Sequence, residues 1–473
     1  MKFLLIRCMS EIQEETKSPF FTKELSDING PSSYPPLGLL YIASSLEHDG
    51  HKVEIIDLSV RKDTVEDLIK KLSLFDVIGF SVYYEDYIFV GKIVKKIKEL
   101  NKKIPVIIGG PYCTFMKKHS LNEIPFADIC VTGEGEEVII DIVRFLNGKK
   151  KLSDIPGIFY REHGKIKNGR PLKIIKNLDS LHFPARHLID KYEYGKISNL
   201  RLLKPKVTAM ITSRGCPFKC RFCGRYGNVI KGWGFRQRSA ENVVEELIEI
   251  DKKYGSVIIY DDCFLVDKKR SHKIMDSLID AGTSIELMIE GIRVDSEDEE
   301  LYKKMKKANV KLVSFGIESG NQDVIDFYNK NFTLEQASKA VRLSRKMGFL
   351  TLSTFILGGS SIETESHIEN TIKFACSLPL DFVNFLPLYY QKGSALWLEE
   401  VKNKKISEDE YTVIADSRRG LGNFTPEELI EFRNSATRRF YLRPSYILDQ
   451  VYQAFLRKNF NLLKYGMKII TRF

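Results

Sequence analysis

Three cysteines lie close together in the segment RGCPFKCRFCG, at Cys216, Cys220 and Cys223. Basic residues surround them, and positive charge favours the thiolate, the form of cysteine that binds metals. A structural zinc site needs four ligands, but the next cysteine or histidine along the chain is Cys263. The spacing therefore favours an iron–sulfur cluster with one iron open to another ligand, and leaves a zinc site or unreactive core cysteines as alternatives.

The elements that would position these cysteines begin at Val207, where short apolar runs start to alternate with amphipathic segments. Six consecutive β/α units with right-handed crossovers predict a partial or full parallel barrel. The chemistry of such a barrel lies at the carboxyl ends of its strands, and the cysteine segment follows the first strand. The predicted helices are 239–253, 267–281, 296–308, 321–328 and 363–377.

A second α/β pattern precedes the barrel. Its runs VIGFSV and VIIGG are continuously apolar, as is typical of parallel strands that are covered on both faces. The alternation predicts a doubly wound, Rossmann-like domain whose ligand would lie at the carboxyl ends of its strands. Neither GxGxxG nor GxxxxGK[ST] is present, so the pattern does not indicate nucleotide binding of the usual kind.

These patterns predict four parts in a chain of the α/β class. The doubly wound domain spans 1–150, and a linker with a β-hairpin, read from IPGIFYREHGKIKNGR, spans 151–206. The barrel spans 207–391, and a mainly helical tail that includes a helix start at Thr425–Pro426 spans 392–473. The basic, amphipathic end of the tail either packs against the barrel or makes peripheral contact with a membrane surface.

The composition predicts a large, cytoplasmic globular protein. The chain has 473 residues, is 43% hydrophobic, and has no apolar run near the roughly 20 residues of a membrane span. Its eight cysteines do not form the evenly spread pattern of a secreted disulfide protein. The net charge of +11 comes from lysine pairs on predicted helix faces without a nucleic-acid motif, so we expect no nucleic acid partner.

The cysteine segment resembles the signature of the radical S-adenosylmethionine (SAM) enzymes, C-x3-C-x-aromatic-C, with Phe222 as the aromatic residue. The resemblance implies that Cys216, Cys220 and Cys223 hold a [4Fe–4S] cluster. It also implies that the open iron binds the amino and carboxylate groups of SAM, and that reductive cleavage yields a 5′-deoxyadenosyl radical. A low-potential electron donor such as flavodoxin or ferredoxin would then be a partner.

The same resemblance implies SAM contacts at the ends of later strands. Asp261 and Asp262 match an acidic motif near the SAM amino group, although an acid at a strand end is often only a helix cap. Glu318, in GIESG, matches the position that binds the ribose hydroxyls.

Four further residues complete the predicted SAM site. Gly358 and Gly359 resemble the adenine-contact segment, although GGSSIE replaces the usual GLPGE. Arg293 matches a basic position in relatives or forms a surface salt bridge, and Phe222 is expected beside the adenine.

The first domain partly resembles cobalamin-binding domains. This resemblance implies that the nucleotide tail of cobalamin lies against glycines at the strand ends. The alternative is a plain set of Rossmann-like turns. The D-x-H-x-x-G motif is absent, and no histidine precedes His48, so no lower axial ligand comes from the expected loop. The matching residues are Ser81, Tyr83 (in place of leucine), Gly109, Gly110, Gly133, Glu134 and Gly135.

Together these matches resemble the cobalamin-binding branch of the radical SAM enzymes, and they imply a methyltransferase acting on an unactivated carbon. One alternative is oxidative cyclisation or rearrangement without net methylation, as in the anaerobic magnesium-protoporphyrin ester cyclase. The other alternative is a non-catalytic iron–sulfur or zinc protein. The substrate is expected to be a small molecule or a lipid-like one, as in the hopanoid methylases of this branch.

Overall fold

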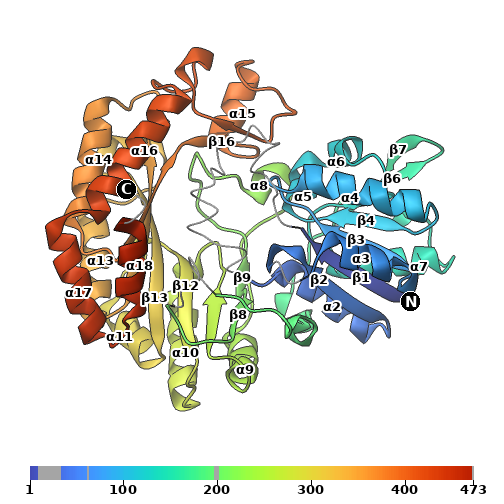
Figure 1. Cartoon of the computed structure of the whole chain (residues 1–473), viewed down its shortest axis with the longest axis horizontal. Helices are drawn as coiled ribbons and strands as arrows, with labels where there is room; N and C mark the ends of the chain where they lie inside the picture. The colour runs from blue at the N-terminus through green and yellow to red at the C-terminus, as the bar shows by residue number, and fades with distance from the viewer. Residues whose placement is uncertain (9–33, 61–62, 196–201, 471–473) are drawn as a thin grey trace. The chain divides into compact units, whose positions relative to one another are not determined.

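The computed structural model describes residues 1–8, 34–60, 63–195 and 202–470. The chain divides into two compact units, shown in Figure 1. The first comprises Met1–Tyr194 with Val229–Trp233, and the second comprises Gly195–Asn228 with Gly234–Phe473.

A seven-stranded sheet of order β2-β1-β3-β4-β5-β6-β7 forms the first unit. Strands β1 to β5 are parallel, while β6 and β7 are antiparallel additions at one edge. The order 2-1-3 reverses the winding direction between β1 and β3, and doubly wound sheets bind ligands at such a point. The strands are β1 (Lys2–Arg7), β2 (Lys52–Asp57), β3 (Val77–Ser81), β4 (Val106–Gly109), β5 (Ile129–Val131), β6 (Ile158–Glu162) and β7 (Lys165–Asn168).

Helices cover both faces of this sheet (Figure 1), which explains the continuously apolar strands. In β1, Phe3 to Ile6 are all buried, and α2 and α7 pack together over one side of the core. The helices are α2 (Leu37–His48), α3 (Val65–Lys71), α4 (Tyr87–Leu100), α5 (Pro111–Met116), α6 (Lys118–Glu123) and α7 (Glu136–Leu146).

Residues 151–194 lie in the first unit instead of forming a separate linker. The expected hairpin is present as β6 and β7, and it extends the sheet beyond β5. Further along, Tyr194 Oη donates to the buried Asp57 carboxylate at 2.9 Å, and the Asp57 N–H donates to Tyr192 Oη at 3.0 Å. The structure therefore ends the first unit at Tyr194 and not at residue 150, because the edge strand and the buried aspartate both take partners from this segment.

The second unit is built on six parallel strands in the order β15-β14-β13-β12-β11-β8. Because the strands follow one another in sequence, this is the partial (β/α)6 barrel that the sequence predicts, with β8 and β15 as its edges. The strands are β8 (Val207–Met210), β11 (Ser256–Ile259), β12 (Glu286–Ile292), β13 (Val310–Glu318), β14 (Leu350–Leu357) and β15 (Phe382–Pro387).

The barrel helices agree with the predicted ranges to within about three residues, with one addition that was not predicted. Helix α13 follows α12, starts with a capping box between Thr333 and Gln336, and ends at Gly348 in the left-handed conformation. The helices are α9 (Ala240–Asp251), α10 (Lys268–Asp280), α11 (Glu299–Lys307), α12 (Gln322–Phe327), α13 (Leu334–Met347) and α14 (Glu365–Ser377).

The tail adds a small β16–β17 pair and four helices to the second unit. Helix α16 begins with the expected cap, since Thr425 and Glu428 form a capping box around Pro426. In the part of the chain that the structure describes, no helix is long and apolar enough to cross a membrane. These elements are β16 (Tyr389–Gln391), β17 (Thr412–Ile414), α15 (Ala395–Lys402), α16 (Pro426–Tyr441), α17 (Pro444–Leu456) and α18 (Asn461–Ile470).

Replacement of Gly110 tests the packing of the first sheet. Gly110 has φ 100° and ψ −172°, a region that only glycine adopts readily, and a Cβ there would lie 2.9 Å from the Val82 carbonyl oxygen. We expect Gly110→Ala to lower the free energy of unfolding by about 1–3 kcal/mol, measured by urea unfolding. Gly38→Ala, in α2 with open space around it, is the control and should not destabilise the chain.

Candidate functional site

The predicted SAM residues of the second unit follow the carboxyl ends of neighbouring barrel strands. The cysteine loop follows β8, the aspartate pair follows β11, and Arg293 follows β12. Glu318 ends β13, and the glycine pair follows β14. Because all of these strands are parallel and adjacent, their ends meet at one edge of the barrel.

The Asp261 carboxylate anchors the chain that leads into the cysteine loop. It accepts hydrogen bonds from the N–H groups of Thr212 at 2.6 Å and Ser213 at 3.2 Å, and from both hydroxyl groups. Asp261 is buried, and desolvation raises its pKa although these hydrogen bonds lower it. Four donors already occupy this carboxylate, so the predicted pair of aspartates divides into an anchor and a second, more accessible group.

Two buried arginines hold the same segment from its carbonyl side. Arg238 Nη1 donates to the Ile211 carbonyl at 2.9 Å, and Arg270 Nη2 donates to the Thr212 carbonyl at 2.9 Å. Residues 211–213 are therefore fixed through both their donors and their acceptors, immediately before the first cysteine.

The middle of the cysteine loop rests on the turn after α12. The Arg221 N–H donates to the Tyr328 carbonyl at 3.0 Å, and Asn329 Nδ2 donates to the Lys219 carbonyl at 2.9 Å. On its other side, the Leu396 N–H of α15 donates to the Arg221 carbonyl at 3.0 Å. The loop is thus held by the barrel and by the tail together.

The three cysteine thiols influence one another electrostatically. Burial, Asp262 and Cys220 raise the pKa of Cys216. Cys223 keeps much of its accessible surface, yet burial of its thiol among neighbouring atoms, then Cys220 and Asp262, raise its pKa to about 12. Neutral thiols grouped in this way become thiolates when a cationic metal group binds them.

Cys263, the distant cysteine considered as a zinc ligand, lies near Cys216. It is buried, and burial followed by the charge of Cys216 raises its pKa to about 12. Among the described residues, no three His, Cys, Asp or Glu side chains form a site for one metal ion. A four-iron cluster needs a wider spacing of its thiolates than one ion does, because each thiolate binds a different iron.

Glu318 forms a buried ion pair with Lys330. Lys330 Nζ lies 3.0 Å from Glu318 Oε1, and both side chains are 8% exposed. Burial by itself lowers the pKa of Lys330, but Glu318 and Cys220 outweigh it and raise the pKa. Glu318 has φ 74°, at a point where the register with β14 shifts. A Cβ on Gly316 would lie 2.4 Å from Glu318 Oε1, so glycine makes room for this carboxylate.

Arg293 joins the cysteine loop to the Lys330 turn. Its guanidinium binds Asp295 through two hydrogen bonds, donates to the Lys330 carbonyl, and stacks 3.8 Å from the ring centroid of Phe218. Arg293 is 8% exposed, so this contact is a buried network and not the surface salt bridge that the sequence left open.

Phe222 lies against the same turn. Its ring packs edge-to-face on Tyr328, with centroids 5.2 Å apart, and Lys330 Nζ lies 5.7 Å from its centroid. The structure therefore brings the signature aromatic residue, the lysine and Glu318 into one neighbourhood.

Asp262 is the accessible member of the acidic pair. Its side chain reaches solvent, although surrounding protein atoms partly desolvate the carboxylate. This desolvation and, after it, the charge of Asp261 raise the pKa of Asp262, while a backbone hydrogen bond from Gly215 lowers it. Strand β12 passes close to the backbone of the two aspartates at Gly291. A Cβ on Gly291 would lie 2.3 Å from the Asp261 carbonyl oxygen, so this position requires glycine.

The glycine pair after β14 is engaged internally. The N–H groups of Gly358, Gly359 and Ser360 all donate to the buried Glu363 carboxylate, at 2.9–3.0 Å. Tyr328 Oη also donates to Glu363 at 3.2 Å. A Cβ on Gly359 would lie 1.8 Å from that of Leu388, so this glycine permits close packing. These amide groups are therefore not available as donors to an adenine.

In the first unit, three predicted strand ends lie side by side. Arg7, Ser81 and Gly109 are register partners across β1, β3 and β4. A Cβ on Gly110 would lie 3.1 Å from Ser81 Oγ, so glycine avoids a close contact with this hydroxyl, which hydrogen-bonds to the Tyr83 side chain. Tyr83, the replacement for leucine in the S-x-L motif, is 38% exposed.

The 133–135 turn has a different arrangement. Glu134 is buried and accepts a hydrogen bond from the Ile175 N–H at 2.7 Å. Gly133 has φ 74°, and Gly135 lies under the Ile42 side chain. The Glu134 carboxylate thus holds the segment after the hairpin. The loop after β1, where a D-x-H-x-x-G motif would lie, falls mainly outside the described residues.

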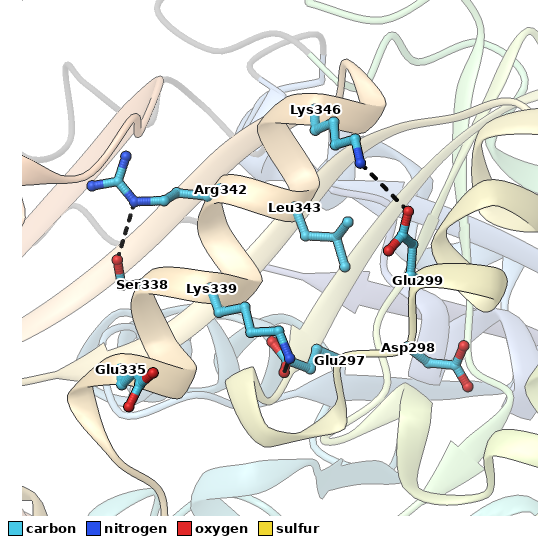
Figure 2. Close-up of a pocket in the computed structure, with 9 residues that line it drawn as sticks. All are labelled: Glu297, Asp298, Glu299, Glu335, Ser338, Lys339, Arg342, Leu343 and Lys346. Carbon is cyan, nitrogen blue, oxygen red and sulfur yellow. Dashed lines mark hydrogen bonds and ion pairs between the residues drawn. The ribbon is translucent and has the colours of Figure 1, made fainter.

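A surface depression of about 510 Å³ lies elsewhere, between α11 and α13 (Figure 2). Two of its lysines pair with its glutamates, Lys339 with Glu297 at 2.6 Å and Lys346 with Glu299 at 3.5 Å. It contains none of the predicted site residues, so we do not assign it to the cofactor site.

Comparison with known proteins identifies both domains. The model of the radical SAM superfamily matches residues 210–375, and that of the B12 binding domain matches residues 28–143. An uncharacterized methyltransferase of Pyrococcus horikoshii is 33% identical over 432 residues, 89% of this chain and 90% of the relative. The chain belongs to the B12-binding radical SAM family. The predicted fold class and the predicted cofactors, a [4Fe–4S] cluster, SAM and cobalamin, are confirmed.

The chain is also similar to a cyclase in sequence and to a solved methyltransferase structure in fold. An anaerobic magnesium-protoporphyrin IX monomethyl ester cyclase of Rubrivivax gelatinosus is 28% identical over 365 residues, 75% of this chain and 64% of the relative. The radical SAM methyltransferase TsrM from Kitasatospora setae superposes with a TM-score of 0.70 at 15% identity, over 94% of this chain and 90% of that one. The latter similarity shows a shared fold.

Three residues of the site were missed by the sequence analysis. Lys330 lies in a turn between two helices, where a lysine looks like any surface lysine. Glu363 is the last residue of the unusual GGSSIE segment, and the replacement of GLPGE was the available signal. Gly291, inside a strand, was a visible signal, since glycine in a strand interior often marks a close approach of another backbone.

The two aspartates allow a matched test of the anchor. Asp261→Asn removes one charged acceptor and turns amide hydrogens toward existing donors, so we expect the free energy of unfolding to fall by about 2–4 kcal/mol. Asp262→Asn, one residue away and exposed, should change it by less than about 0.5 kcal/mol. Urea unfolding of the whole chain measures both, and equal effects of the two substitutions would contradict the anchor.

Proposed function

We propose that this chain is a C-methyltransferase that transfers a methyl group to an unactivated carbon of a small or lipid-like substrate. The observation that carries the proposal is the union of a radical SAM domain and a B12 binding domain, together with a methyltransferase relative aligned over nearly the whole chain. When bound, the cluster with SAM supplies a radical that takes a hydrogen atom from carbon, and cobalamin supplies the methyl group. A low-potential donor such as flavodoxin or ferredoxin would deliver the electron.

We assign the cluster to Cys216, Cys220 and Cys223, because the loop that bears them is held at its entry and at its middle. Burial and neighbouring negative charge raise the pKa values of Cys216 and Cys223, so a cationic group would stabilise these two thiolates. Asp262 is assigned to the SAM amino group, since it is an exposed carboxylate beside this loop.

Glu318 is assigned to the ribose hydroxyls. Its Oε1 binds Lys330, while no hydrogen bond of Oε2 to another described residue is present, so a carboxylate oxygen is left to accept from a ligand. Phe222 is assigned to the adenine side. Asp261 and Arg293 act through the loop as positioning residues, and Gly358 and Gly359 shape the site through their close packing.

For cobalamin we propose the strand-end edge of the first unit. The support is the position of Ser81, Gly109 and Gly110 at the carboxyl ends of adjacent strands, next to the reversal of strand order. Tyr83 adds an exposed aromatic side chain at the same edge. Gly133 and Gly135 are assigned to the nucleotide tail, with Glu134 holding their turn.

Oxidative cyclisation is the second candidate function, because a cyclase aligns with 75% of the chain. Product analysis under anaerobic reductant with methyl-labelled SAM separates the two. We expect both S-adenosylhomocysteine and 5′-deoxyadenosine, with label in the substrate. Formation of 5′-deoxyadenosine without S-adenosylhomocysteine would exclude methyl transfer. Cys220→Ala should retain the fold but lose the cluster iron and all SAM cleavage. A wild-type protein that never cleaves SAM would indicate a non-catalytic protein.

If the Lys330–Glu318 pair serves SAM binding, a second substitution should restore the stability of a Lys330 variant without restoring its SAM affinity. Lys330→Met leaves a buried carboxylate unpaired, which we expect to cost about 3–5 kcal/mol of unfolding free energy. Adding Glu318→Gln removes that charge and should recover most of the loss.

Both variants should nevertheless bind SAM more weakly, by tenfold or more in equilibrium dialysis, because the ribose acceptor is displaced or uncharged. Wild-type stability of Lys330→Met, or wild-type SAM affinity of the double variant, would contradict the assignment.

A further inference from the structure

Helix α17 has an inverted amphipathic pattern. A surface helix normally turns its apolar side toward the core, but two of the four buried residues of α17 are glutamines: Tyr446, Gln450, Gln453 and Ala454. Tyr446 Oη donates to the Asp381 carbonyl at 2.7 Å, and Gln450 Nε2 donates to the Asp381 carboxylate at 3.3 Å. The inner side of α17 is thus held by hydrogen bonds.

The outer side of α17 is apolar and exposed. Its residues follow the spacing i, i+3, i+4, i+7 and i+8, which makes one continuous stripe. In Figure 1, α17 lies on the outside of the second unit, with α18 packed beside it. The stripe continues through Phe460, which packs edge-to-face on Phe455, toward α18. We call this set the outer apolar face: Leu448 (71% exposed), Val451 (39%), Tyr452 (62%), Phe455 (62%), Leu456 (64%), Phe460 (52%) and Met467 (59%).

The charged residues that follow Asp449, which itself pairs with Arg345, are all basic. After Asp449 the chain contains no aspartate or glutamate, and its charged residues are Arg457, Lys458, Lys464, Lys468 and Arg472. Lys458 and Lys464 are exposed and make no ion pair with a described residue. An apolar stripe accompanied by exposed, unpaired lysines is complementary to a surface that is apolar inside and anionic at its boundary.

We propose that the outer apolar face of α17 and α18 docks on the surface of an anionic phospholipid membrane, with both helices lying in the plane of the interface. A second copy of the chain fits less well, because two such faces would bring their cations together. Tyr452 offers the aromatic body and polar tip that suit the headgroup level. The proposal is independent of methyl transfer, since no residue of the face belongs to the cofactor site.

Vesicle flotation of the anaerobically purified full chain tests the docking. We expect binding to vesicles of 30% phosphatidylglycerol in phosphatidylcholine, and at least tenfold weaker binding to phosphatidylcholine alone. Leu448→Glu with Phe455→Glu should reduce the binding at least tenfold, and Lys458→Gln with Lys464→Gln should reduce it severalfold. Salt should weaken binding to the anionic vesicles.

A matched control places the same substitutions elsewhere. Leu74 and Leu100, 57% and 61% exposed on the first unit, are changed together to glutamate and should leave vesicle binding unchanged. Circular dichroism melts of all variants confirm that they fold. Absence of binding to the anionic vesicles, or equal effects of the two glutamate pairs, would overturn the proposal. So would a dimer, seen by light scattering, that Leu448→Glu with Phe455→Glu dissociates without affecting vesicle binding.

Discussion

The candidate site of the second unit depends on the carboxylate of Asp261. A short loop carrying three thiols has no regular structure of its own to hold its geometry, so its entry must be held from outside. Asp261 accepts four hydrogen bonds from Thr212 and Ser213, and Arg238 and Arg270 bind the neighbouring carbonyls. A buried carboxylate is costly to desolvate, and this set of donors offsets that cost.

A second buried charge pair extends this support across the barrel. Lys330 neutralises the buried charge of Glu318. The turn that contains Lys330 contacts Arg293 on one side and the cysteine loop on the other. Buried ion pairs contribute little net stability, so their value here is positional: they fix carboxylate oxygens where a polar ligand would meet them. Glu363 has a different role, because its carboxylate gathers three amide N–H groups and so fixes the turn after β14.

The two units build the strand-end edges of their candidate sites by the same principle, although their folds differ. Parallel strands end side by side, and glycines allow the following turns to lie close to neighbouring backbone. Gly110 does so above Ser81 and Val82, and Gly291 does so behind Asp261. Helix α17 in the tail differs from an ordinary surface helix. Its hydrogen-bonding side faces inward to Asp381, and its apolar side is exposed.

The sequence by itself determined the class of the chain. The spacing of Cys216, Cys220 and Cys223 and the two rhythms of apolar runs are local patterns, and they predicted the cluster loop, the doubly wound domain and the partial barrel. Only the tertiary structure decided which polar residues are left to meet a ligand. Asp261 and Asp262 are neighbours in sequence, yet one is buried among four donors and the other is exposed. Lys330 and the outer apolar face were likewise decided by packing, because burial and hydrogen-bond partners depend on segments that are far apart along the chain.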